Sequence, residues 1–453
     1  MEDNNILKKF TTAQFLNFAL GFFGLQFAWQ MRIILSGPVT EGLGASPFIY
    51  GLIWLAGPFT GMVVQPLIGN MSDRTNTRFG RRRPYLLGGA ILASLALWAF
   101  PNSQNIANIF GNSFGVNLPL WSGLLVAAIM IWIIDACVNV AQGPYRALIP
   151  DVVPQEQHSI ANSYISLAIG LGSVVAAGTA PFLKLVFNYQ MSIEAQFIMA
   201  ALAFTLGMLW TCITIKERKL EKSENRKNEE VKKESFIDSI KEFFALSPEV
   251  SKICLMQFFT WIGTMCMMIF FTQYSVHTIF GVPDIAVAGS DFKDATLEGT
   301  NFSSICFAIF NLICFLVAIP IGVFSAKVGN KKVHIFSIVT MIFAYLIMAF
   351  SHNKIVVAMM MGVSGIGWAS ICALPFAMLS RYIKPGTEGS VMGIFNIFIA
   401  GPQVVVCTIV AWLINHSVFE NTLGTFYHWE YAFIVGAIMF TLAILTTLFV
   451  KEK

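Results

Sequence analysis

The sequence predicts an all-α membrane protein with twelve transmembrane helices in two pseudo-symmetric six-helix bundles. Three observations lead to this prediction: a low share of charge, twelve long apolar runs, and fragments that recur in both halves. Hydrophobic residues make up 56% of the 453-residue chain and charged residues only 12%, against roughly 25% charged in soluble domains. Most of the outer surface is therefore expected to face lipid, which excludes an ordinary soluble enzyme.

Twelve apolar runs reach the length of about 20 residues that an α-helix needs to cross a bilayer core. The first six lie at about residues 12–36, 48–71, 84–101, 122–147, 160–187 and 195–215. The second six lie at about residues 254–280, 303–325, 333–350, 356–379, 389–415 and 430–450. We therefore expect an N-terminal bundle over residues 1–215 and a C-terminal bundle over residues 253–453.

The linker at residues 216–252 is dense in Lys and Glu. Apolar residues follow at helical spacing near its end, which is typical of a short amphipathic helix on a membrane surface. These residues are Phe236, Ile237, Ile240, Phe243 and Phe244. A loop that only joins the two bundles is the alternative interpretation.

Basic residues are concentrated in alternate loops. If the N-terminus is cytosolic, the cytosolic segments hold 24 of the 29 Lys and Arg residues. These segments are residues 1–11, 72–83, 216–252, 326–332, 380–388 and 451–453. Loops on the other side contain only Lys293 and Lys354. The positive-inside rule therefore predicts a multi-pass protein of the plasma membrane or bacterial inner membrane, with both termini in the cytosol.

Two sequence patterns recur in the two halves. After the second span, residues 69–83 read GNMSDRTNTRFGRRR, and after the eighth span, residues 322–332 read GVFSAKVGNKK. Prolines ten residues apart also recur at the ends of spans four and ten: Pro144 and Pro154, and Pro375 and Pro385. Such repetition indicates two related halves.

The loop at residues 69–83 combines residue types that suit a conformational gate. Gly lets helix ends approach closely, Asp can lie at the positive N-terminus of a neighbouring helix, and Arg can bind carbonyls or carboxylates. The candidate gating residues are Gly69, Asp73, Arg74, Gly80, Arg81 and Arg82. The alternative is that the arginines only set the topology. Because Ala326 replaces the acid in the second copy, that loop is expected to form a weaker gate.

Asp135 lies near the middle of the fourth span, where an ionised carboxylate costs at least ~2.5–3.5 kcal/mol. Asn139, Gln142 and Arg146 follow on the same helix face, within about 40° of it. Arg146 lies about 16 Å away along the helix axis, so it cannot pair directly with Asp135. This face suits a proton carrier; the alternative is an acid permanently paired with Arg32 of the first span.

Amides and aromatic rings on other spans could complete a cavity for a neutral, polyhydroxylated ligand. Amides both donate and accept hydrogen bonds, and the C–H faces of sugars stack on aromatic rings. With Asn139 and Gln142, the candidate ligand-binding residues are Gln26, Trp29, Gln30, Asn162, Trp261, Gln273, Trp368, Asn396 and Gln403. Ser166 and His277 are further polar residues within spans. Packing or anchoring at the membrane interface is the alternative role for these side chains.

Two six-helix halves, each with such a loop after its second span, resemble the major facilitator superfamily over nearly the whole chain. That resemblance implies a substrate site near the bilayer midplane between the halves. Four stretches make the resemblance more specific, at residues 26–38, 57–84, 132–148 and 396–403. They look like the proton-coupled sucrose and disaccharide carriers, which include plant sucrose transporters and bacterial maltose-type relatives, close to the glycoside-pentoside-hexuronide symporters.

The narrower resemblance implies import of a neutral disaccharide, an α-glucoside such as maltose or sucrose, by proton symport with alternating access. It also implies that Asp135 is the protonation site and Arg146 a basic residue of the transport path. In the seventh span, plant sucrose carriers have acidic residues where this chain has Phe271, Thr272 and Gln273, so maltose is at least as well favoured as sucrose. Two alternatives stay open: a proton-coupled exporter with the same fold, and a non-transporting sugar sensor.

No enzymatic, cofactor or metal site is predicted. The eight cysteines lie in apolar runs without zinc-ligand spacing, and no nucleophile motif has a companion base. The net charge of +4 is too small and scattered to indicate a nucleic-acid partner. We therefore expect a monomeric transporter, with a sugar, the lipid bilayer and the proton as its partners.

Overall fold

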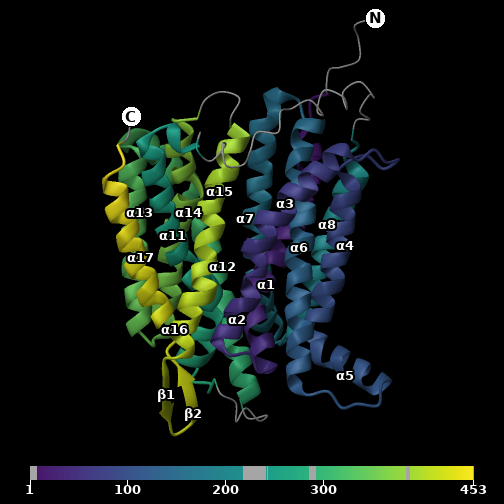
Figure 1. The fold of residues 1–453 in the computed structure, drawn as a ribbon, viewed down its shortest axis with the longest axis vertical. Helices are drawn as coiled ribbons and strands as arrows, with labels where there is room; N and C mark the ends of the chain where they lie inside the picture. Colours follow the sequence, from purple (N-terminus) through teal and green to yellow (C-terminus); the bar gives the residue numbers. More distant parts are fainter. Residues whose placement is uncertain (1–7, 218–240, 242, 285–291, 384–387, 452–453) are drawn as a thin grey trace, which may run out of the picture. The chain divides into compact units, whose positions relative to one another are not determined.

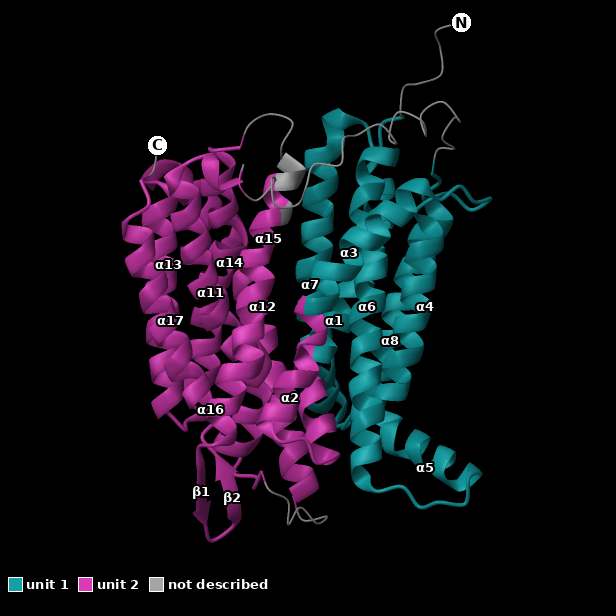
Figure 2. Ribbon diagram, in the orientation of Figure 1, with its two compact units in different colours: residues 1–32, 59–232 teal, residues 33–58, 233–453 magenta. Residues whose placement is uncertain are grey.

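The computed structural model describes residues 8–217, 241, 243–284, 292–383 and 388–451. Within these residues, twelve helical segments are long and apolar enough to cross a membrane, and each coincides with a predicted span. The prediction of a twelve-helix membrane protein is therefore confirmed. The chain divides into two compact units, drawn in different colours in Figure 2.

Unit 1 comprises residues 1–32 and 59–232. Its helices (Figure 1) are the first part of α1 (Thr12–Gly42), most of α3 (Ala56–Arg74), α4 (Arg83–Ala99), α5 (Ser103–Ser113), α6 (Leu120–Val152), α7 (His158–Phe187) and α8 (Ile193–Thr214). Local sequence sets several boundaries. α7 ends at Asn188, which adopts a left-handed conformation with φ 50°, and the Ser192 side chain caps α8 by accepting the Ala195 N–H.

Unit 2 comprises residues 33–58 and 233–453. Its elements are the last part of α1, α2 (Pro47–Trp54), α11 (Pro248–Gln273), α12 (Lys293–Val328), α13 (Asn330–Phe350), α14 (Lys354–Ser380), α15 (Glu388–Val405), α16 (Ala411–Asn415), β1 (Val418–Asn421), β2 (Gly424–Tyr427) and α17 (Tyr431–Leu448). β1 and β2 form an antiparallel hairpin that projects at one end (Figure 1). We call this the hairpin end of unit 2.

Prolines and π-helical segments interrupt the regular helices. Pro144 of α6 and Pro375 of α14 both lie inside helices, in agreement with the repeated pattern seen in the sequence. Membrane helices tolerate such residues where neighbouring groups bind the freed carbonyls. α11 continues directly into a π-helical segment, Tyr274–Ile279, and the segment between α15 and α16 is also π-helical, Val406–Val410.

Two predicted details differ from the structure. α11 begins at Pro248, inside the predicted linker, because Ser247 caps it and Pro248 occupies its first turn. Phe243 is buried in an apolar cluster of unit 2 with Val250 and Ile253, so the prediction that it lies on a membrane surface is wrong. Phe236, Ile237 and Ile240 lie outside the described residues. The division into bundles at residues 1–215 and 253–453 stays a prediction.

Candidate functional site

A buried ion pair joins α1 and α6 inside unit 1. Arg32 Nη2 lies 2.5 Å from Asp135 Oδ2, and both residues have no exposed surface. The other carboxylate oxygen, Oδ1, is buried without a hydrogen-bond partner among the described residues. The Arg32 guanidinium also lies 5.2 Å from the centre of the Trp29 ring, within the range of a cation–π interaction. The pair therefore places two opposite charges in the buried interior of unit 1.

Amide side chains extend this polar face of α6, as predicted. Asn139 Nδ2 donates to the Asp135 main-chain oxygen at 2.9 Å and to Thr60 Oγ1 at 3.0 Å. Gln65 Nε2, from α3, donates to Asn139 Oδ1 at 2.6 Å and to Gln142 Oε1 at 3.3 Å. Gln65 was not among the predicted site residues. Its position as an amide inside an apolar span is the signal that could have identified it.

Arg146 does not lie beside Asp135. It is exposed on α6, and the partner of Asp135 is Arg32, the alternative that the sequence left open. A permanent structural pair and a pair that opens when Asp135 takes up a proton are both compatible with this geometry. The roles of Asp135 and Arg146 in proton coupling therefore stay predictions.

The other ligand-binding candidates of unit 1 have different surroundings. Gln26 and Trp29 are half-buried on α1, and Gln30 is buried. Asn162 is exposed on α7, and its Nδ2 donates to the His158 main-chain oxygen at 2.9 Å. The structure thus brings Trp29 to the buried ion pair, whereas Asn162 bonds to its own helix.

Two tryptophans predicted to bind ligand meet inside unit 2. The rings of Trp261 on α11 and Trp368 on α14 lie edge to face, with centres 5.6 Å apart. Trp261 Nε1 is buried without a hydrogen-bond partner among the described residues. The same holds for both amide atoms of Gln257, one helical turn earlier. Unsatisfied buried groups of this kind point to a bound water or ligand, and the sequence analysis missed Gln257.

The remaining candidates of unit 2 are less clearly placed for ligand binding. Gln273 is fully buried and packs against α1, where a Cβ added to Gly37 would lie 1.9 Å from its Nε2. Gln403 Nε2 donates to the Ile399 main-chain oxygen at 3.2 Å, and Asn396 is exposed. Both amide atoms of Gln273 are, like those of Gln257, buried without a hydrogen-bond partner among the described residues. The ligand-binding roles of all three stay predictions.

The loop after α3 is held by a network of ion pairs within unit 1. The Nε atoms of Arg81 and Arg82 donate to Asp151 Oδ2 at 3.1 and 3.2 Å. Arg82 Nη2 lies 2.5 Å from Asp73 Oδ1, and its Nη1 donates to Ser72 Oγ at 2.6 Å. The predicted gating residues Asp73, Arg81 and Arg82 are thus brought together, and with Asp151 they join the ends of α3, α4 and α6.

An acid from the end of the sixth span lies at the N-terminus of α4. The Glu217 carboxylate accepts the main-chain N–H groups of Arg81, Arg82 and Arg83 at 2.7, 3.0 and 2.7 Å, where the helix dipole favours an anion. We expected Asp73 at such an N-terminus, and this prediction is wrong. Asp73 instead binds the Arg82 side chain, and its own side chain is 50% exposed.

The two predicted gating glycines, Gly69 and Gly80, differ in how closely other atoms approach them. Gly80 has a φ of +107°, and a Cβ there would lie 2.8 Å from the Glu217 carboxyl group, so glycine is required. At Gly69 a Cβ would meet no described atom within 4 Å, so the close helix approach expected there is absent from this conformation. Arg74, the last residue of α3, is exposed. The gating role of these residues stays a prediction.

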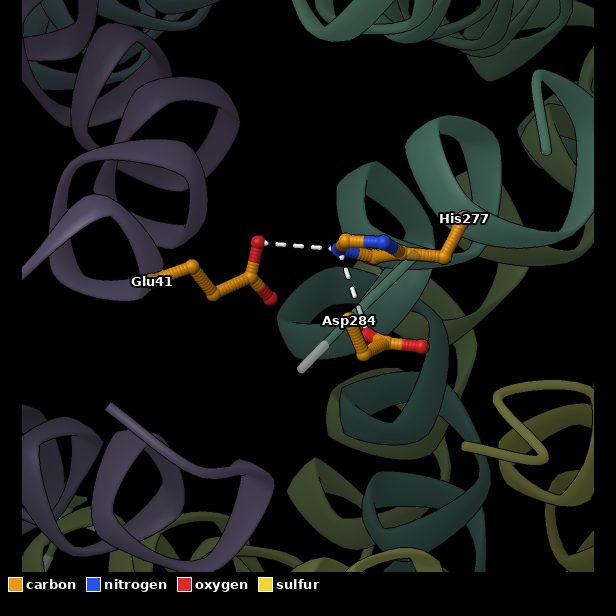
Figure 3. Close-up of side chains that lie close together, drawn as sticks. All are labelled: Glu41, His277 and Asp284. Atoms are coloured by element: carbon orange, nitrogen blue, oxygen red, sulfur yellow. Dashed lines mark hydrogen bonds and ion pairs between the residues drawn. The ribbon is translucent and has the colours of Figure 1, made fainter. Parts of the chain in front are cut away.

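Three ionisable side chains meet at the hairpin end of unit 2 (Figure 3). His277 Nε2 lies 3.0 Å from Glu41 Oε2 and 3.3 Å from Asp284 Oδ1. The Asp284 oxygens accept hydrogen bonds from Trp429 Nε1 at 2.7 Å and from the Tyr427 main-chain N–H at 2.9 Å. Burial raises the pKa of Asp284 to about 6, although His277 and these hydrogen bonds oppose the rise.

Close packing surrounds this cluster. The hydroxyl groups of Ser36 and Tyr50 are 3.1 Å apart, and Tyr50 also donates to the Ile269 main-chain oxygen at 3.3 Å. A Cβ added to Gly51 on α2 would lie 2.3 Å from the Cys407 main-chain oxygen. Residues 33–58 and the later helices of unit 2 are therefore tightly joined at the hairpin end.

The sequence analysis singled out His277 but not its two acidic partners. Glu41 precedes His277 by 236 residues in the chain, so no local spacing connects them. The available signal was weaker: Glu41 and Asp284 are acids at the ends of apolar spans, in regions that otherwise contain little charge.

Comparison with known proteins gives matches over most of the chain. The sequence model of the Major Facilitator Superfamily matches residues 18–400 and, separately, residues 253–453. Sucrose transport protein SUC4 of Arabidopsis thaliana is 28% identical over 84% of this chain and 80% of its own length. Sucrose transport protein SUT2 of Oryza sativa subsp. indica is 26% identical over 84% of this chain and 83% of its own length.

A fungal relative and two solved structures are similar as well. The general alpha-glucoside permease of Schizosaccharomyces pombe is 29% identical over 64% of this chain and 52% of its own length. The structure of the nucleoside transporter NupG covers 98% of this chain and 100% of its own, with a TM-score of 0.66 and 14% identity. A D-xylose-proton symporter covers 98% of both chains, with a TM-score of 0.63 and 14% identity. At this identity the two structures indicate a shared fold only.

Proposed function

Because the chain belongs to the Major Facilitator Superfamily, whose members are transporters and not enzymes, we propose that it imports a neutral disaccharide by symport with protons. The substrate class is an α-glucoside such as maltose or sucrose. The protein would alternate between states open to either side of the membrane, with the sugar bound between its halves. The proton is the coupling ion, and transport requires no other cofactor.

Two observations support a sugar as substrate. Relatives that align with most of the chain are sucrose transport proteins, and another relative is an alpha-glucoside permease. The described interior also offers neutral polar groups: the linked amides of Gln65, Asn139 and Gln142, and the unsatisfied amide of Gln257. Such groups suit hydroxyl-rich, uncharged ligands.

The observation that carries proton coupling is the buried pair of Arg32 and Asp135. One Asp135 oxygen binds Arg32, and the other has no partner among the described residues. Protonation of Asp135 would cancel its charge, weaken the hold on Arg32 and give the carboxyl group a hydrogen to donate. Proton uptake could thus change the contacts between α1 and α6, and Arg146 would serve further along the path.

The orientation is part of the proposal. With 24 of 29 basic residues in alternate loops, both termini would lie in the cytosol, and the hairpin end of unit 2 would face outward. The membrane would be the plasma membrane or a bacterial inner membrane.

The protein would act as a monomer and without a nucleic-acid partner. The network around Arg81 and Arg82 would stiffen its cytosolic gate.

The test is a panel of sugars offered to proteoliposomes that contain the purified protein and a pH indicator inside. We expect accumulation of an α-glucosidic disaccharide, internal acidification, and loss of accumulation when the proton gradient is dissipated. Protein-free liposomes are the control. Proton movement opposite to the sugar would instead identify an exporter, and sugar binding without flux a sensor; either result would reject the proposal.

A further inference from the structure

The cluster of Glu41, His277 and Asp284 sets two carboxyl groups against a single imidazole ring. His277 Nδ1 lies 2.8 Å from the Val282 main-chain oxygen, which can only accept, so Nδ1 carries a hydrogen. The other ring nitrogen, Nε2, therefore faces two carboxylate oxygens, at 3.0 and 3.3 Å. Three electron-rich atoms so close together require a shared proton, on Nε2 or on a carboxyl group, or a metal ion between them.

The donor atoms match the preferences of a divalent transition metal. One imidazole nitrogen and two carboxylate oxygens are ligands that Zn²⁺ and related ions accept, often with a fourth position left open. All three donor atoms lie within 4.8 Å of one another. Tetrahedral ligands at ~2.0–2.1 Å from a zinc ion are about 3.3 Å apart, close to the two distances from Nε2.

The groups behind these donors are those that usually orient metal ligands. His277 donates its other ring N–H to a backbone carbonyl, and Asp284 accepts from the Trp429 indole and the Tyr427 main chain. Such contacts fix the tautomer of a ligating histidine and the direction of a ligating carboxylate. Figure 3 shows both carboxylates directed at the same edge of the imidazole ring.

A free acceptor in the cluster favours a metal ion over a proton. Glu41 Oε1 is buried and has no hydrogen-bond partner among the described residues. A single proton on Nε2 cannot serve both carboxylates well and leaves this oxygen without a partner. A metal ion binds several oxygens at once and can also hold water in an open position.

We propose that Glu41, His277 and Asp284 bind a divalent transition-metal ion with the chemistry of Zn²⁺. His277 borders a cavity of about 200 Å³ that is also lined by His352, His428 and Glu430. This cavity provides a route of entry, and its imidazole and carboxylate groups attract cations on the way.

Metal binding would also affect transport, a consequence that rests on the proposed function. Glu41 belongs to α1, whereas His277 and Asp284 follow α11. Opening of the outward side must separate residues 33–58 from the later helices. An ion bound to all three side chains would hold the hairpin end closed, so external Zn²⁺ is expected to inhibit uptake.

Calorimetric titration of the full-length protein with zinc chloride, after dialysis against a chelator, tests the site directly. We expect one tight site, and affinity lower by about 100-fold or more in E41Q and D284N. W429F removes the indole N–H that donates to Asp284 but keeps an aromatic ring beside His277, and it should weaken binding by ~10-fold. H416N is the matched control, because the exposed His416 also bonds a carbonyl through Nδ1 and should leave binding unchanged.

Thermal unfolding without metal establishes that each variant is folded, and E41Q is the most secure variant because Glu41 is the most exposed of the three side chains. An absence of zinc binding, or equal affinity in native protein, E41Q and D284N, would overturn the proposal and leave the cluster with a proton only. In uptake assays, zinc should inhibit the native protein more than E41Q, each relative to its metal-free rate. If no sugar is transported at all, the proposed function fails while the titration still decides the metal site.

Discussion

Two buried charged clusters among the described residues, one in each unit, differ in charge balance and in access. Arg32 and Asp135 form a one-to-one pair without exposed surface in unit 1. Glu41, His277 and Asp284 set two acids against one imidazole in unit 2, beside a cavity. The first cluster is already neutral, so gain or loss of a proton disturbs it. The second has one more acid than base, so a bound metal cation, as proposed above, would complete it.

The largest expected effect comes from Asp135→Asn. This change removes the only titratable oxygens of the neutral pair, so sugar accumulation against a gradient should be abolished while sugar exchange can persist. Proteoliposomes loaded with or without unlabelled sugar measure the two activities separately. D294N, the same change at an exposed acid of α12, is the control, and unchanged accumulation in D135N would refute the coupling role.

Neutralising both Arg32 and Asp135 distinguishes a role in proton coupling from a role in stability alone. D135N alone removes the carboxylate that balances the buried Arg32 charge, which costs ~3–5 kcal/mol. The double variant R32Q/D135N should therefore recover much of the lost thermal stability but not accumulation. Thermal unfolding in detergent and uptake assays provide the two measurements. Recovery of both would mean that the pair is only structural.

A smaller effect is expected at the hairpin end from Gly51→Ala. The new Cβ would collide with the Cys407 main chain and the Ala411 side chain, and overpacking of this kind costs ~1–3 kcal/mol. We expect lower thermal stability and weaker zinc binding together. G42A is the matched control, since a Cβ there would meet no described atom within 4 Å. Equal behaviour of the two variants would show that this end is not held by close packing.

The smallest effect is expected from Trp29→Phe. The indole ring contributes a cation–π interaction with Arg32, and its replacement by a weaker phenyl ring should cost ~0.5–1 kcal/mol. W98F, at a tryptophan that is 53% exposed, should change stability less. A rise in the KM for sugar with unchanged stability would instead identify Trp29 as a ligand contact.

Much of the fold could be predicted because bilayer thickness fixes the length of each apolar run. The polar face of α6 was also predictable, since Asp135, Asn139 and Gln142 lie on one helix and follow its period. Partners on other helices were harder to predict from the sequence. Arg32 was considered only as an alternative, and Gln65 and Glu217 were missed. The cluster around His277 depends on side chains from distant parts of the chain, which no local pattern records.

The π-helical segment Tyr274–Ile279 has a consequence for how the cluster around His277 could arise. Relative to a regular α-helix, a π-bulge inserts one residue and rotates the residues after it by about 100°. Both His277 and the turn that leads to Asp284 depend on that register. Insertion of one residue in this segment would therefore create the cluster, and deletion of one residue would destroy it, without changing the number of membrane spans.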